Sequence, residues 1–180
     1  MEQWHKDRLE NLTLGIINEF EYLKPKVAKN DSFYAVALIT DEDVMTAFLA
    51  ISSQNDYLKN ANPYGYWGDR WSAVEWAIAI RSDDIKGGIS DLYLPQMYKY
   101  FEEIIEPKDD DYEEDRNNFI ELYTEALKCA KLKLIAKYGS EVENAIFFLD
   151  IPGDGEIAIK SAKIINGPSE LLNQMLDDLD

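Results

Sequence analysis

Apolar residues recur along this chain with two periods, one typical of helices and the other of buried strands. From residue 2 to residue 29 every third or fourth position is apolar, which predicts an amphipathic helix that Pro25 ends or bends near Leu23. A longer helix with acids at its start and lysines toward its end is predicted to stop at Gly139. Its apolar face consists of Phe119, Leu122, Tyr123, Ala126, Leu127, Ala130, Leu134 and Tyr138. Shorter helices are expected over residues 92–105 and after the Asn166-Gly-Pro-Ser-Glu segment.

The strand-like segments are either continuously apolar or alternating. Residues 33–39 are apolar on both faces and predict a central strand, and residues 44–51 predict its antiparallel hairpin partner. Residues 145–151 predict a third strand, and the alternation over 156–160 favours a fourth. Together these segments predict one α+β domain over residues 1–180. We expect an antiparallel sheet of about three to five strands packed with several helices, including a long N-terminal helix.

Three of the four tryptophans lie within ten residues, in the segment Trp67-Gly-Asp-Arg-Trp71-Ser-Ala-Val-Glu-Trp76. Ser72 and Glu75 have the spacing of a capping box, so a short helix is expected to begin at Ser72. The segment is either a structural corner or a recognition surface, since tryptophan is mostly buried but is also enriched at interface hot spots. Trp76 fits the first interpretation and Trp67 the second. The candidate partner-binding residues are Tyr64, Tyr66, Trp67, Arg70, Trp71 and Glu75, with the acidic run Asp109, Asp110 and Asp111.

The charge of the chain narrows the classes of partner. Its 35 acidic and 18 basic residues give a net charge of −17 and a pI of about 4.4. Such a chain repels phosphate backbones, which argues against direct nucleic-acid binding, and it attracts basic partners. The longest clean apolar run is too short to span a bilayer, and the first residues lack the apolar stretch of a secretory signal. We therefore expect a cytoplasmic protein with no membrane association.

Residues that carry chemistry are few. His5 is the only histidine and is expected in a frayed first helical turn, while Cys129, the only cysteine, has no local basic partner and can form no intrachain disulfide. We therefore expect no catalytic residues and no cofactor. Asp150, Asp154 and Glu156 cluster at a strand-to-turn junction, where their oxygens could hold Mg²⁺ or Ca²⁺, although the spacing does not match a calcium loop. A carboxylate-based metal-dependent enzyme or small-molecule binder is therefore an alternative.

Several segments resemble a bacterial family described as the domain of unknown function DUF4303. The resemblance spans most of the chain, with the Trp-Ser-x-x-Glu-Trp core of residues 71–76 as its specific part. Residues 33–41, the late strand ending at Asp150, and Asn166-Gly-Pro before a terminal helix agree in order and spacing. In the family a proline often follows the serine, where this chain has Ala73. The family has no established catalytic residues, so none can be carried over to this chain.

Members of that family are similar to components of bacterial toxin–immunity systems in size, acidity and lack of a signal. Combined with the charge and the aromatic segment, the resemblance favours a non-catalytic acidic binding protein, with an immunity protein for a basic toxin domain as the specific case. An interaction module of a larger complex is a further alternative, and the residues do not separate it from the first. The sequence leaves the oligomeric state open.

Overall fold

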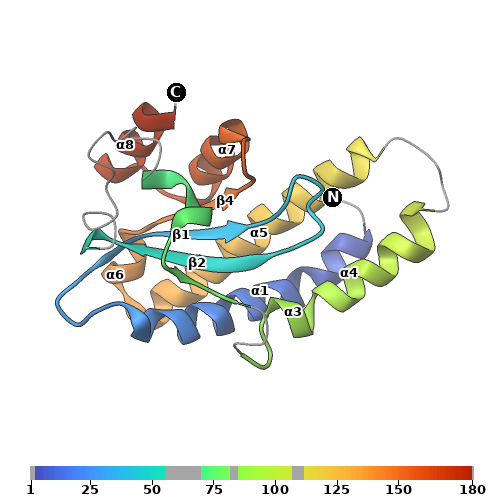
Figure 1. Cartoon of the computed structure of the whole chain (residues 1–180), viewed down its shortest axis with the longest axis horizontal. Coiled ribbons are helices and arrows are strands. Elements are labelled where there is room, and N and C mark those ends of the chain that lie inside the picture. The colour runs from blue at the N-terminus through green and yellow to red at the C-terminus, as the bar shows by residue number, and fades with distance from the viewer. Residues whose placement is uncertain (1–2, 56–69, 82–84, 107–111, 180) are drawn as a thin grey trace.

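The computed structural model describes residues 3–55, 70–81, 85–106 and 112–179, which form an α+β fold with helices on both faces of a mixed four-stranded sheet (Figure 1). The strand order is β3-β2-β1-β4. The strands are β1 (Phe33–Ile39), β2 (Phe48–Ser53), β3 (Ile78–Ala79) and β4 (Ile146–Asp150). The α-helices are α1 (Gln3–Leu23), α3 (Ile89–Leu92), α4 (Leu94–Tyr100), α5 (Glu113–Tyr138), α6 (Ser140–Glu143), α7 (Gly155–Ile165) and α8 (Glu170–Leu179). Within the described ranges, no helix is both long and apolar enough to cross a membrane.

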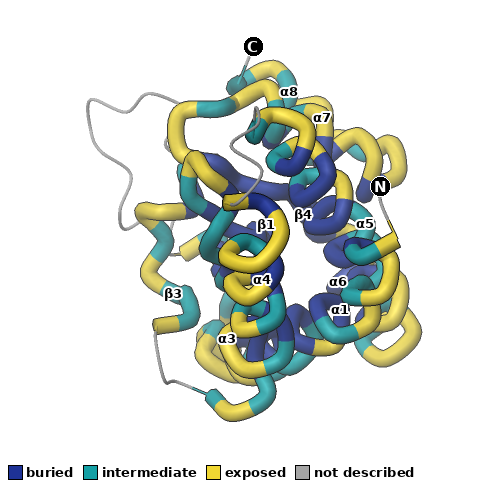
Figure 2. Tube along the Cα trace, turned by 90° about the vertical axis from the view of Figure 1, so that its right-hand side faces the viewer, coloured by how far each residue is buried: buried dark blue, intermediate teal, exposed yellow. Residues whose placement is uncertain are grey.

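Side chains of the sheet enter two cores because successive strand residues point to opposite faces. Val36 and Leu38 of β1 face the larger core, which α1, α3, α4 and α5 cover. Ala37 and Ile39 face the smaller core, which the segment around Trp71 covers together with α7 and α8. The strands in the middle of the molecule are therefore buried, whereas the helices expose their outer turns (Figure 2).

The structure confirms several predicted elements and the residues at which they end. The first helix ends at Leu23, where Pro25 stands in a short 3-10 turn (Lys24–Lys26), and β1 covers the predicted residues. The long helix α5 ends where Gly139 takes a positive φ of 66°, a conformation that suits glycine. His5 differs from the expectation of a frayed turn, because it is fully buried with its ring 4.9 Å from that of Phe119.

The prediction of a purely antiparallel sheet is wrong. β1 and β2 form the expected antiparallel hairpin, with Leu38 opposite Leu49, but β4 pairs with β1 in parallel, with Leu38 opposite Leu149. A parallel neighbour requires a crossover connection, and the helices between β2 and β4, above all the 26-residue α5, supply it. The carboxyl ends of β1 and β4 therefore lie at the same end of the sheet.

Two predicted strand positions also differ from the structure. β2 begins at Phe48 and not at Val44, which lies in the preceding loop with a φ of 53° and a carbonyl that accepts the Tyr123 hydroxyl at 2.8 Å. Residues 156–160 belong to helix α7 and not to a fourth strand. The Asp154 carboxylate caps this helix by accepting the Ile157 N–H at 3.2 Å, a signal that competes with the alternating pattern.

The outer edge of β4 is covered by side chains. Asn166 donates to the Phe147 carbonyl at 2.8 Å, and its Oδ1 accepts the Phe147 N–H at 2.9 Å. Ser161 accepts the Leu149 N–H at 2.9 Å, and the buried Lys131 ammonium donates to the Ala145 carbonyl and to Asn166 Oδ1. Burial lowers the pKa of Lys131 from 10.5 to about 8. Side chains of α5, of α7 and of Asn166, just after α7, thus satisfy the backbone groups that a further strand would otherwise bind.

The buried Glu19 of α1 acts in the same way on the other side of the sheet. Its two carboxylate oxygens accept the N–H groups of Leu49 in β2, at 2.9 Å, and of Ile89 at the start of α3, at 2.8 Å. Burial raises the pKa of Glu19 from 4.5 to about 7, although the two N–H donors oppose the rise. One carboxylate therefore links a helix, a strand and a second helix.

Candidate functional site

The segment around Trp71 is part of the smaller core. The Trp71 side chain is 2% exposed, its indole N–H donates to Asp178 of α8 at 2.8 Å, and its ring meets those of Tyr34 and Phe148 edge to face. A buried indole with a satisfied N–H is the structural arrangement expected of tryptophan. Trp71 therefore joins the end of the chain to the sheet and has almost no surface to offer a partner.

The neighbours of Trp71 complete this corner. The Arg70 carbonyl accepts the Trp76 indole N–H at 3.3 Å and the Tyr34 hydroxyl at 3.1 Å, and the Arg70 guanidinium lies over the Tyr34 and Trp71 rings. The structural interpretation of Trp76 agrees with these contacts. The expected capping box is wrong, because residues 73–75 form a 3-10 turn with no side-chain cap from Ser72. Of the predicted contact residues in this corner, Glu75 is exposed.

The remaining predicted contact residues fall outside the described part of the chain. Tyr64, Tyr66 and Trp67 lie in the stretch 56–69, and Asp109, Asp110 and Asp111 lie in the stretch 107–111. Their assignment as partner-binding residues stays a prediction.

The three carboxylates of the alternative metal site serve different contacts. Asp150 accepts the Ala73 N–H at 3.1 Å and is 9% exposed, and burial raises its pKa from 3.8 to about 6. Asp154 caps α7 and lies 3.7 Å from the Arg116 guanidinium, whereas Glu156 is exposed on the first turn of α7. Among the described residues no group of three His, Cys, Asp or Glu side chains is arranged to hold a metal ion.

The histidine and the cysteine are also placed by packing. His5 lies among the rings of Trp4, Tyr100 and Phe119, inside the larger core. The Cys129 thiol is half-buried 3.8 Å from a Glu125 oxygen, and burial, followed by the negative charge of Glu125, raises its pKa. A raised pKa keeps a thiol protonated and therefore poorly nucleophilic.

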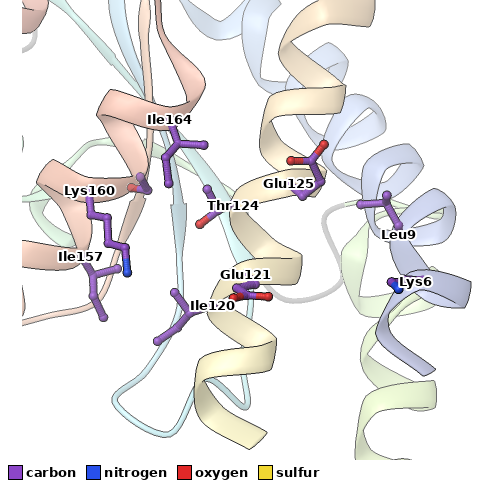
Figure 3. Close-up of a pocket in the computed structure, with 10 residues that line it drawn as sticks. Lys6, Leu9, Ile120, Glu121, Thr124, Glu125, Ile157, Lys160 and Ile164 are labelled. Carbon is purple, nitrogen blue, oxygen red and sulfur yellow. The ribbon is translucent and has the colours of Figure 1, made fainter. Parts of the chain in front are cut away.

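A groove of about 460 Å³ lies along the outer surface of α5, with α1 on one side and α7 on the other (Figure 3). Its apolar residues are Leu9, Ile120, Ile157 and Ile164, and its charged residues are Lys6, Glu121, Glu125 and Lys160. The hydroxyl groups of Thr124 and Ser161 also line it, but the Ser161 hydroxyl is occupied by the Leu149 N–H and the Ala158 carbonyl. The volume lies within the range of small-molecule and cofactor sites.

One end of the groove adjoins an acidic surface. Ile120 and Ile157 stand about one helical turn after Arg116 and Asp154, whose side chains pair across the gap between α5 and α7. Arg116 also donates to the Glu42 carbonyl at 2.9 Å, which ties the β1–β2 loop to the first turns of α5 (Figure 1). We call this region the acidic end; its carboxylates come from Glu42, Asp43, Glu113, Glu114, Asp154 and Glu156.

The groove was not predicted from the sequence, and its signal is weak. On α7 the lining residues are Ile157, Lys160, Ser161 and Ile164, which follow the i, i+3, i+4, i+7 spacing of one helix face. This face adjoins the one that carries Ala158, Ala162 and Ile165 into the cores, and Ile157 itself packs against the larger core. An exposed isoleucine beside the buried face of the helix, as at Ile164, is therefore the sequence feature that could have indicated a surface groove.

The comparisons with known proteins place the chain in a family. The family model described as "Domain of unknown function (DUF4303)" matches residues 12–150, which is more than half of the chain, so the chain belongs to this family. The matched residues include most of α1, all four strands and α5, whereas α7 and α8 follow them. No curated protein and no solved structure matches the chain.

Proposed function

We propose that this member of the DUF4303 family is a non-catalytic binding protein that takes up a basic protein partner. The observation that supports the proposal is the meeting of two features, since the apolar groove on α5 opens beside the acidic end. Acidic residues at the rim of an interface attract a basic partner and raise its association rate. Aliphatic side chains in a groove then supply the apolar area whose burial holds the complex together.

The net charge of −17 means that the molecule as a whole also attracts basic partners. At physiological salt an exposed charge acts over about 8 Å, so the carboxylates of the acidic end dominate the encounter. The specific case that we propose is an immunity protein of the bacterial cytoplasm, whose partner is the basic domain of a toxin. Occlusion of the toxin surface would then be the mechanism, and no bond would be made or broken by this chain.

The experiment compares capture of a partner by the wild-type protein and by two charge variants. In the cell that naturally produces the protein, we expect a basic protein to co-purify with the tagged wild type. The Glu42→Lys, Asp43→Lys double variant should lose this partner, because it reverses two exposed charges of the acidic end. Asp177→Lys changes an exposed acid on α8 and should retain it.

The immunity case has its own readout. Production of the captured protein without this chain should stop cell growth, and the wild type should restore growth. Equal capture by all three proteins, or capture that does not weaken as salt rises, would contradict a charge-guided interface. Growth that is unaffected by the captured protein would contradict the immunity case and leave a binding module in a larger complex.

A further inference from the structure

We propose that the groove on α5 takes the apolar face of an amphipathic helix whose other face is basic. The inference rests on the proposed function and goes beyond it, because it names the structural element of the partner and the surface that receives it. α1 and α7 form two ridges with α5 lying between them (Figure 3). A helix laid along such a groove presents apolar anchors at the spacing i, i+3, i+4 and i+7.

The residues of the groove suit such anchors. Leu9 and Ile120 are half-buried, and Ile164 leaves 47% of its surface exposed, so aliphatic area is available without opening the core. Ile157 and Ile164 are seven residues apart on α7, which places them two turns from each other on one face. Their spacing matches that of the anchors on an incoming helix.

Charge decides between a partner helix and a second copy of this chain. Inside the groove the two lysines, Lys6 and Lys160, balance Glu121 and Glu125, so the groove itself has no net preference. Two copies would each carry a charge of −17 and would repel each other. A helix with a basic outer face is attracted instead, most strongly at the end of the groove near Arg116, which ties the loop of Glu42 to α5.

The test uses two synthetic peptides of leucine and lysine, each about five helical turns long. In one peptide the leucines occupy a single face, and in the other the same residues are distributed around the helix. Fluorescence anisotropy of the labelled peptides gives the dissociation constants for the full chain. We expect the wild type to bind the one-faced peptide at least about ten times more tightly than the distributed peptide.

Matched variants assign this difference to the groove. Ile164→Glu places a charge in the groove and should weaken binding of the one-faced peptide about tenfold, with a smaller loss for Ile164→Ala. Leu132→Glu is the control, because Leu132 is also exposed on a helix, at 61%, but does not line the groove. It should leave binding of both peptides unchanged.

The outcomes separate this inference from the proposed function. Equal affinity of the wild type for the two peptides, or equal losses in the Ile164 and Leu132 variants, would overturn the helix-in-groove inference alone. The Glu42→Lys, Asp43→Lys variant should weaken binding of both peptides to a similar degree. If it weakens neither, the charge-guided interface of the proposed function fails instead. Unfolding curves in urea confirm that each variant is folded, and Ile164→Ala supplies the groove test if Ile164→Glu does not fold.

Discussion

Replacement of Asn166 by alanine tests whether side chains close the outer edge of β4. The Asn166 side chain makes four hydrogen bonds, to the N–H and C=O groups of Phe147, to the Ala162 carbonyl and to Lys131. Alanine removes all four. Lys131 keeps the Ala145 carbonyl, and the Ala162 carbonyl keeps the backbone N–H of residue 166, so the Phe147 backbone loses most.

The expected loss follows from the number of groups left without a partner. Phe147 is fully buried, and a buried backbone donor or acceptor without a hydrogen bond costs about 1–3 kcal/mol. Two such groups give a decrease of roughly 2–6 kcal/mol in the free energy of unfolding, a large share of the 5–15 kcal/mol typical of a domain. Asn166→Asp keeps an acceptor for the Phe147 N–H but places a carboxylate oxygen beside the Phe147 and Ala162 carbonyls, so it should also destabilise the protein.

Equilibrium unfolding in urea, followed by circular dichroism and by tryptophan fluorescence, measures these differences. Asn144→Ala is the control, because Asn144 is exposed just before β4 and should change the free energy of unfolding by less than about 0.5 kcal/mol. If Asn166→Ala is no less stable than Asn144→Ala, the side chain does not support the edge of β4 and the reasoning fails.

Three further variants test the interior. Because the folded protein holds the Glu19 proton more tightly than the unfolded chain, the free energy of unfolding should fall as pH rises from about 4.5 to about 7. Glu19→Gln should remove roughly 2–3 kcal/mol of that fall, so parallel pH profiles of wild type and variant, measured by urea unfolding, would refute this. Trp71→Phe removes the hydrogen bond to Asp178 and should cost about 1–3 kcal/mol in thermal unfolding, whereas an unchanged midpoint would show that the bond is dispensable. Gly15→Ala should destabilise by about 1–3 kcal/mol, because its Cβ would lie 3.0 Å from the Ile89 backbone, and a more stable variant would contradict this close packing.

The sequence predicted elements whose period and end signals agree. Residues 33–39 are apolar on both faces, and the strand they form is buried between two neighbours. The direction of β4 could not be predicted in this way, because a strand buried on both faces has the same pattern in parallel and antiparallel pairing. Five alternating residues fit a short strand and also one turn of a helix, so the pattern of residues 156–160 does not decide between the two. The cap that Asp154 provides favours the helix, which is what the structure contains.

The candidate site depended on contacts that are distant in sequence. Trp71 is buried because Asp178, 107 residues later, accepts its indole N–H. The groove combines residues of three helices, each of which contributes only part of a face. Packing between helices, and not the pattern of any one of them, therefore determines which apolar residues remain at the surface.

Asn166 and Ser161 also determine where a self-contained unit of this chain can end. The family match stops at residue 150. Ser161 of α7 and Asn166, just after α7, nevertheless form hydrogen bonds with the outer backbone groups of β4. A chain cut after Asp150 would present an apolar strand with unoccupied N–H and C=O groups, and such an edge recruits strands from other molecules. α7 therefore protects the sheet against intermolecular strand pairing, and a stable, monomeric fragment has to extend at least through Asn166.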